Sequence, residues 1–157
     1  MASAKSTLTF FVGAMLAYVV SSYVAGFIGI GLGEAQYYPP SSNALSFLRE
    51  IPSQSVVFPA AILHGLLLGF VFYPFRKRVL ELGRLYGCLA MSSVIFVIGE
   101  LIASLDQSVY YVSIPLGYYV VVAIELLIQA LLFGQLMFAW EKRFNRIPYA
   151  ISVGGPK

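Results

Sequence analysis

Charged residues are scarce in this 157-residue chain: they make up 11% of it, whereas 59% of its residues are hydrophobic. A soluble domain has about 25% charged residues, so this composition excludes an ordinary soluble fold. The mean hydropathy of +0.83 indicates a polytopic membrane protein. At this length, spanning helices and short loops use up the chain, and we expect no separate soluble domain.

Cysteine and histidine are also rare, with one of each. A single cysteine excludes an internal disulfide, a cysteine-rich metal site and a CxxC redox pair. A single histidine excludes a bis-histidine haem site. Neither G-x-S-x-G nor the P-loop pattern occurs, and the glycine-rich run at residues 26–33 follows no strand. We therefore predict no catalytic residues, no metal, no cofactor and no nucleic-acid partner.

Long apolar runs dominate what remains. They predict transmembrane helices at residues 7–32, 56–75, 85–105 and 114–140, because about 20 mostly apolar residues cross a bilayer. The expected fold is all-α, a single-domain bundle of four transmembrane helices, with a basic connection after the second helix and a basic tail at residues 141–157. Pro59 is expected in the first turn of the second helix, where its missing N–H costs little.

The basic residues predict the orientation in the membrane. If the head, the middle connection and the tail share one side, that side carries every Lys and Arg except Arg49. By the positive-inside rule, both termini are then cytoplasmic. The compact chain and the strong charge bias favour the plasma membrane of a prokaryotic cell.

Small residues recur every four positions on the first predicted helix, and a second series lies on the second helix. Such spacing lets two helix backbones approach closely and gain van der Waals contact. The expected packing residues are Gly13, Ala17, Ser21, Ala25, Gly29 and Gly33, then Ala61, Gly65 and Gly69, and finally Gly134. A pore wall or a hinge is the less favoured interpretation of the same residues.

When the sequence is aligned with itself at a shift of 65 positions, two segments match. This shift aligns His64 with Gln129, Gly69 with Gly134, and the Arg-Lys-Arg run at 76–78 with Glu-Lys-Arg at 141–143. Apolar runs align easily by chance, so a tandem repeat of two helix pairs and a chance similarity both stay open. A true repeat would be parallel, with its pseudo-axis along the membrane normal.

The apolar runs contain a few polar residues, which define a candidate intramembrane site. Its expected members are His64, Glu100, Glu125 and Gln129. Glu125 and Gln129 are four residues apart and share a helix face. Ionisable groups are expensive inside a membrane, so they indicate a proton relay or a cation site. The structural alternative, which we favour for Gln129 and for Gln135, is that these groups hydrogen-bond between helices and set their register.

Three classes of function remain, and the favoured one is non-enzymatic. In it, the protein is an accessory or interaction subunit whose helix faces bind a second copy of the chain or other membrane-protein subunits within the bilayer. The runner-up is a small proton- or cation-coupled transporter, oligomeric because four helices enclose little lumen, that uses the candidate polar site. A membrane-embedded enzyme acting on a lipid or quinone is the least favoured, since the loops offer no nucleophile-base set.

Overall fold

The computed structural model describes residues 4–33, 54–97 and 116–144, and within these ranges the chain is helical, with no strand. The elements are α1 (Ala4–Gly31), α2 (Gln54–Phe72), the 3₁₀ helix η3 (Tyr73–Phe75), α3 (Arg76–Glu81), α4 (Gly83–Val94) and α6 (Leu116–Phe144). This confirms the all-α prediction for the described part of the chain.

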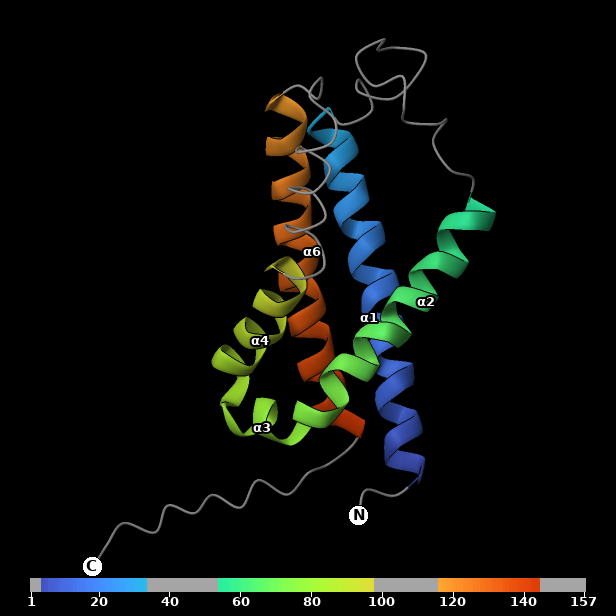
Figure 1. The fold of residues 1–157 in the computed structure, drawn as a ribbon, viewed down its shortest axis with the longest axis vertical. Coiled ribbons are helices and arrows are strands. Elements are labelled where there is room, and N and C mark those ends of the chain that lie inside the picture. The colour runs from blue at the N-terminus through green and yellow to red at the C-terminus, as the bar shows by residue number, and fades with distance from the viewer. Residues whose placement is uncertain (1–3, 34–53, 98–115, 145–157) are drawn as a thin grey trace, which may run out of the picture.

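The long helices pack as a row rather than a closed ring. Helix α1 packs against both α2 and α6, and α4 packs against the other side of α6. Figure 1 shows α1 and α6 side by side, α2 inclined across α1 with its first turns splayed away, and α3 lying across the lower end. The start of α1 and the end of α6 lie at this same lower end (Figure 1).

Within the described ranges, three helices are long and apolar enough to cross a membrane: Ala4–Gly31, Val57–Glu81 and Gly117–Phe144. They support a membrane-embedded protein. The helix in the place of the third predicted span is apolar but shorter, Gly83–Val97. The rest of that predicted span, residues 98–105, lies outside the described residues, as do residues 145–157 of the predicted tail.

The second predicted span, residues 56–75, is divided in the structure, because α2 ends at Phe72 and η3 follows. The predicted basic connection begins with α3 at residues 76–81. Pro74 lies in the first turn of η3, and since proline lacks an N–H and crowds the preceding turn, the regular helix ends before it. Gly83, with a φ of 78°, then reverses the chain into α4 in a left-handed conformation that glycine adopts without strain.

The first turn of α2 also differs. Helix α2 begins at Gln54, so Pro59 lies inside the helix rather than in its first turn. There the proline removes one backbone hydrogen bond of the helix.

The core forms where α1, α4 and α6 converge toward the lower end of α2. Its largest fully buried apolar side chains are Phe133, Ile95 and Met137. The remaining buried members of the cluster are Phe10, Ala14, Ala17, Phe72, Leu80, Cys88, Met91, Ala130 and Phe138. Large apolar side chains on the outer faces, such as Phe27, Phe70 and Leu85, stay exposed, as expected for helices that face lipid.

Small residues lie at the close approaches between helices. Gly13, Ala17, Ser21, Ala25 and Gly29 are buried on α1, Ala61, Gly65 and Gly69 are buried on α2, and Gly33 is half-buried. A Cβ added at Gly65 would lie 2.6 Å from the Cα of Met15, and one added at Gly134 would lie 2.6 Å from the carbonyl oxygen of Cys88. At both points the backbone of one helix lies against its neighbour, and any side chain would separate them.

Candidate functional site

Glu125 lines a cleft of about 280 Å³ between α1, α2 and α6. Its carboxylate lies beside Gly26 of α1, since a Cβ added at that glycine would be 3.8 Å from Oε1 of Glu125. The other lining residues are Ser22, Tyr23, Phe27, Ile30, Gln54 and Val57. The cleft opens where the first turns of α2 splay away from α1 (Figure 1), so α1 forms its floor and α2 and α6 its walls.

A side-chain hydrogen bond crosses the cleft at the end where α2 begins. The hydroxyl of Tyr23 on α1 donates to Oε1 of Gln54 at the start of α2, at 2.5 Å. This bond ties the splayed end of α2 to α1. The cleft therefore offers a carboxylate, an amide and a phenol on an otherwise apolar lining.

Gln129 lies one helical turn from Glu125 along α6 and is 5% exposed. Its Nε2 has no hydrogen-bond partner among the described residues. Glu125 lies opposite Gly26 and Trp140 lies opposite Gly13, so the antiparallel register places Gln129 about level with Ser22.

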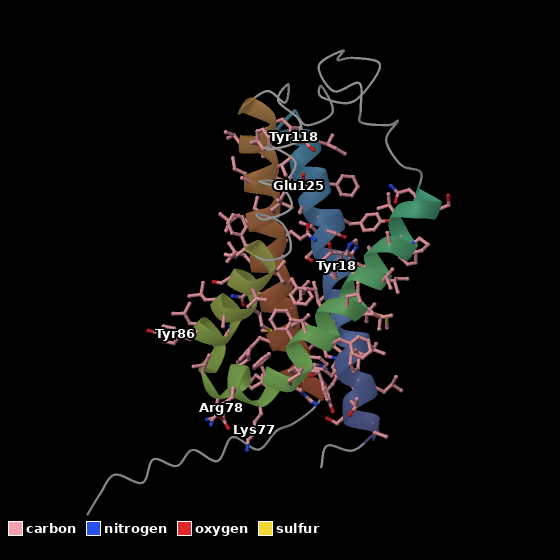
Figure 2. The ribbon with its side chains drawn as sticks, viewed as in Figure 1. Tyr18, Lys77, Arg78, Tyr86, Tyr118 and Glu125 are labelled. Atoms are coloured by element: carbon pink, nitrogen blue, oxygen red, sulfur yellow. The ribbon has the colours of Figure 1, made fainter. Side chains whose placement is uncertain are left out.

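His64 lies elsewhere. Its side chain is exposed on α2, its ring stacks on Tyr18 with centroids 5.5 Å apart, and its Nδ1 donates to the carbonyl oxygen of Ala60 at 3.0 Å. Tyr18 also contacts Phe133 of α6, at 6.4 Å between centroids. Tyr18 therefore lies between α2 and α6, halfway along α1, whereas Glu125 lies nearer the upper end (Figure 2).

The structure thus brings Glu125 and Gln129 onto one face of α6 but does not bring His64 to them. Tyr18 and Gly26, their contacts on α1, are eight residues apart, which corresponds to about 12 Å along a helix. Glu100, the fourth predicted member, lies outside the described residues. Among the described residues, no cluster of three or more His, Cys, Asp or Glu side chains could hold a metal ion.

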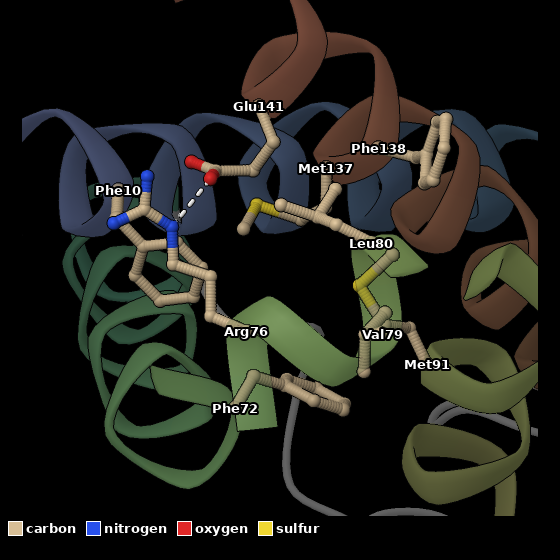
Figure 3. A pocket seen from close by; sticks show the side chains of 9 residues that line it. All are labelled: Phe10, Phe72, Arg76, Val79, Leu80, Met91, Met137, Phe138 and Glu141. Carbon is tan, nitrogen blue, oxygen red and sulfur yellow. Dashed lines mark hydrogen bonds and ion pairs between the residues drawn. The ribbon is translucent and has the colours of Figure 1, made fainter. Parts of the chain in front are cut away.

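One polar contact was not expected from the sequence: a buried ion pair between Arg76 of α3 and Glu141 of α6. Nε of Arg76 lies 2.5 Å from Oε2 of Glu141, and the side chains are 9% and 3% exposed. The guanidinium also lies over the ring of Phe10, 5.3 Å from its centroid. Figure 3 shows the pair at the edge of a small void of about 10 Å³ lined by Phe72, Leu80, Met91 and Met137.

This pair joins α3 and α6 and brings both against α1. Glu141 is the first residue of the predicted basic tail, and α6 continues through it to Phe144. A sequence signal did exist, since the 65-residue shift aligns Arg76 with Glu141. In a true repeat, Arg76 and Glu141 would occupy equivalent positions on two helices and could meet near the pseudo-axis that relates them. The alignment alone does not predict that the two side chains are in contact.

A second group of charges lies at the same lower end. Arg84 of α4 and Lys142 and Arg143 of α6 line a cleft of about 510 Å³ together with Phe138 and Ala139. Arg84 donates to Oε1 of Gln135 from Nε and Nη2, at 3.4 and 3.3 Å. Gln135 therefore orients a basic side chain.

The described residues can thus accept hydrogen bonds or hold a cation at Glu125, and can hold an anion at the basic lower end. Comparison of the chain with protein-family models, with curated proteins and with solved structures gave no match.

Proposed function

We propose that this chain is a non-enzymatic integral membrane protein that binds a transmembrane helix of a partner membrane protein in the Glu125 cleft. The cleft supports this proposal because it is open between two spanning helices and carries a carboxylate within an apolar lining. An ionised carboxylate in an apolar cleft attracts the cation of a neighbouring helix, because the low dielectric of the membrane strengthens their Coulomb interaction. A helix with one Lys or Arg at this depth supplies both a donor and an apolar surface.

His64 adds independent support for a covered face on α2. It is exposed at the level of Tyr18, halfway along α1, and its Nδ1 donates within α2, to the carbonyl oxygen of Ala60. A polar ring at mid-depth is unfavourable against lipid tails. A partner helix that lies along α2 and extends beyond the cleft would shield the His64 ring from the lipid tails.

The orientation belongs to the same proposal. Lys5, Arg76, Arg84 and Arg143 lie on elements that meet at one end, as the Arg76–Glu141 and Arg84–Gln135 contacts require. The positive-inside rule makes this end cytoplasmic. We place the protein in a prokaryotic plasma membrane with four spans, both termini inside, and its own helices packed along the small-residue positions of α1 and α2.

A synthetic spanning helix tests the proposal. Two dansyl-labelled Leu/Ala peptides of 21 residues, one with Lys and one with Leu at the centre, are added to vesicles that contain the full chain. The only tryptophan, Trp140, serves as the energy-transfer donor. We expect the Lys peptide to bind about threefold to eighteenfold more tightly, since one interhelical polar contact in a membrane contributes about 0.6–1.7 kcal/mol.

Two variants locate the effect. Glu125→Gln should abolish the preference for the Lys peptide, whereas Glu81→Gln, which removes an acid from the α3 surface, should keep it. Equal binding of both peptides to the unmodified chain would refute the proposal. Self-association of the chain that excludes both peptides would assign the cleft to a second copy instead.

Cation or proton transport is the second candidate, and the position of Glu125 favours it. The carboxyl lines a cleft of about 280 Å³, which has room for water. In vesicles loaded with a pH-sensitive dye, transport predicts a proton flux that Glu125→Gln abolishes while the protein stays folded. Infrared difference spectra across pH should show the carboxyl titrating, with the band lost in Glu125→Gln. A flux equal to that of protein-free vesicles excludes this candidate.

A further inference from the structure

The basic cleft at the lower end lies between the first turn of α4 and the last turn of α6. Arg84 reaches it from α4, and Lys142 and Arg143 reach it from α6. Phe138 and Ala139, one turn earlier on α6, form its apolar wall. The cleft of about 510 Å³ thus has cations at its mouth and apolar side chains toward the middle of the membrane.

The charge pairing sets these cations apart from their neighbours. Arg76 pairs with Glu141, while Lys77 and Arg78 lie 3.9 and 3.2 Å from the carboxylate of Glu81. By contrast, no carboxylate of the described residues pairs with Arg84, Lys142 or Arg143. Three cations that face one cleft without an acid repel one another, and an anion between them would remove that repulsion.

Helix geometry adds to the attraction. Helix α4 begins at Gly83 without a side-chain cap, so the positive end of its macrodipole lies beside Arg84. Gln135 accepts two hydrogen bonds from Arg84, and this holds one cation in place at a reduced entropic cost.

We propose that this cleft binds a phosphate group, and that the phosphate belongs to the headgroup of an anionic lipid. The site lies at the end of the spanning helices, where headgroup phosphates of the inner leaflet lie if the basic end is cytoplasmic. Basic pockets between transmembrane helices on that side suit such headgroups. Ala139 is exposed on α6 and is placed to contact the start of an acyl chain. The site rests on the orientation given in the proposed function, but it needs no partner helix at Glu125.

The test measures lipid binding to the full chain in zwitterionic detergent micelles by native mass spectrometry. Phosphatidylglycerol is compared with phosphatidylcholine of the same chain length, and we expect at least tenfold tighter binding of phosphatidylglycerol. Each basic residue near an anionic surface contributes roughly fivefold. Lys142→Gln with Arg143→Gln should therefore lower the affinity for phosphatidylglycerol by about 10-fold or more.

The matched control is Lys77→Gln with Arg78→Gln, which removes two positive charges from the same end but leaves the cleft intact. It should lower the affinity less than threefold. Arg84→Lys keeps the charge and should keep most of the binding, and it shows that the cleft tolerates a conservative change. Equal losses in the two double variants, or equal binding of the two lipids, would overturn the proposal.

Soluble glycerol phosphate distinguishes the two sources of phosphate. If glycerol phosphate displaces phosphatidylglycerol only at concentrations far above that of the lipid, the phosphate is that of a lipid headgroup, because the apolar wall then contributes to binding. If glycerol phosphate binds as tightly as the lipid, the lipid assignment is wrong and the cleft is a site for a soluble phosphate.

Discussion

Replacing Gly65 by alanine tests a close backbone contact between α1 and α2. The added Cβ would lie 2.6 Å from the Cα of Met15, 2.9 Å from the carbonyl oxygen of Ala14 and 3.2 Å from the amide nitrogen of Met15. Non-bonded carbon atoms prefer about 3.5–4.0 Å. Because the opposing atoms are backbone, no side-chain rotation relieves the clash, and α1 and α2 must separate by about 1 Å.

Two opposing effects set the size of the change. Alanine favours a helix interior over glycine by about 1 kcal/mol, whereas overpacking a close contact costs typically 1–3 kcal/mol. Separation of α1 from α2 also weakens the packing of Gly69 against Phe11 one turn away, where a Cβ would already lie 2.8 Å from the ring. We expect Gly65→Ala to lower the free energy of unfolding by about 1–2 kcal/mol.

Unfolding by sodium dodecyl sulfate in mixed micelles, followed by the fluorescence of Trp140, measures this change. Trp140 is a sensitive reporter, because its indole lies against Gly13 and donates to the carbonyl oxygen of Thr9 at 2.9 Å. The matched control is Gly31→Ala, since a Cβ there meets nothing within 4 Å. The control should change stability by less than about 0.5 kcal/mol. Equal stability of the two variants would refute the close α1–α2 contact.

Three further predictions concern single contacts. Glu141→Gln should destabilise the fold by about 3 kcal/mol in the titration with sodium dodecyl sulfate, because it leaves the charge of Arg76 buried. Changing both Arg76 and Glu141 to Met should restore most of the lost stability, and a double variant as unstable as Glu141→Gln would contradict a local ion pair. Tyr73→Phe removes a 2.8 Å hydrogen bond to Thr7 and should cost about 1 kcal/mol by thermal unfolding, whereas an unchanged midpoint would show that the bond does not contribute. Gly134→Ala places a Cβ 2.6 Å from a backbone oxygen of α4 and should cost about 1–2 kcal/mol, measured by detergent titration; a gain in stability would contradict this contact.

Hydropathy alone located the long helices. The predicted spans at residues 7–32 and 114–140 correspond to Ala4–Gly31 and Leu116–Phe144. The signal is strong because lipid penalises every charged group, so the apolar runs are long and nearly free of charge. The ends differ by one to four residues. The largest difference is at the end of α6, because Glu141 and Lys142 continue the helix beyond the apolar run.

The candidate site was only partly predictable. An acid within an apolar run marks Glu125 as unusual, but the sequence contains no information on the depth at which His64 meets α1. That depth depends on the inclination of α2, which packing at Gly65 and Gly69 determines. The structure accordingly separates His64 from Glu125 and places Glu125 with Tyr23 and Gln54 instead.

Composition and hydropathy by themselves therefore determined that this is a helical membrane protein, where its long helices lie, and which polar residues fall inside them. These properties depend on the free energy of transferring each residue into lipid, which is local. Only the tertiary structure decided the Arg76–Glu141 pair, the cleft at Glu125 and the basic cleft at Arg84. Each of these joins side chains from separate helices, and their meeting depends on the crossing angles and register that close packing sets.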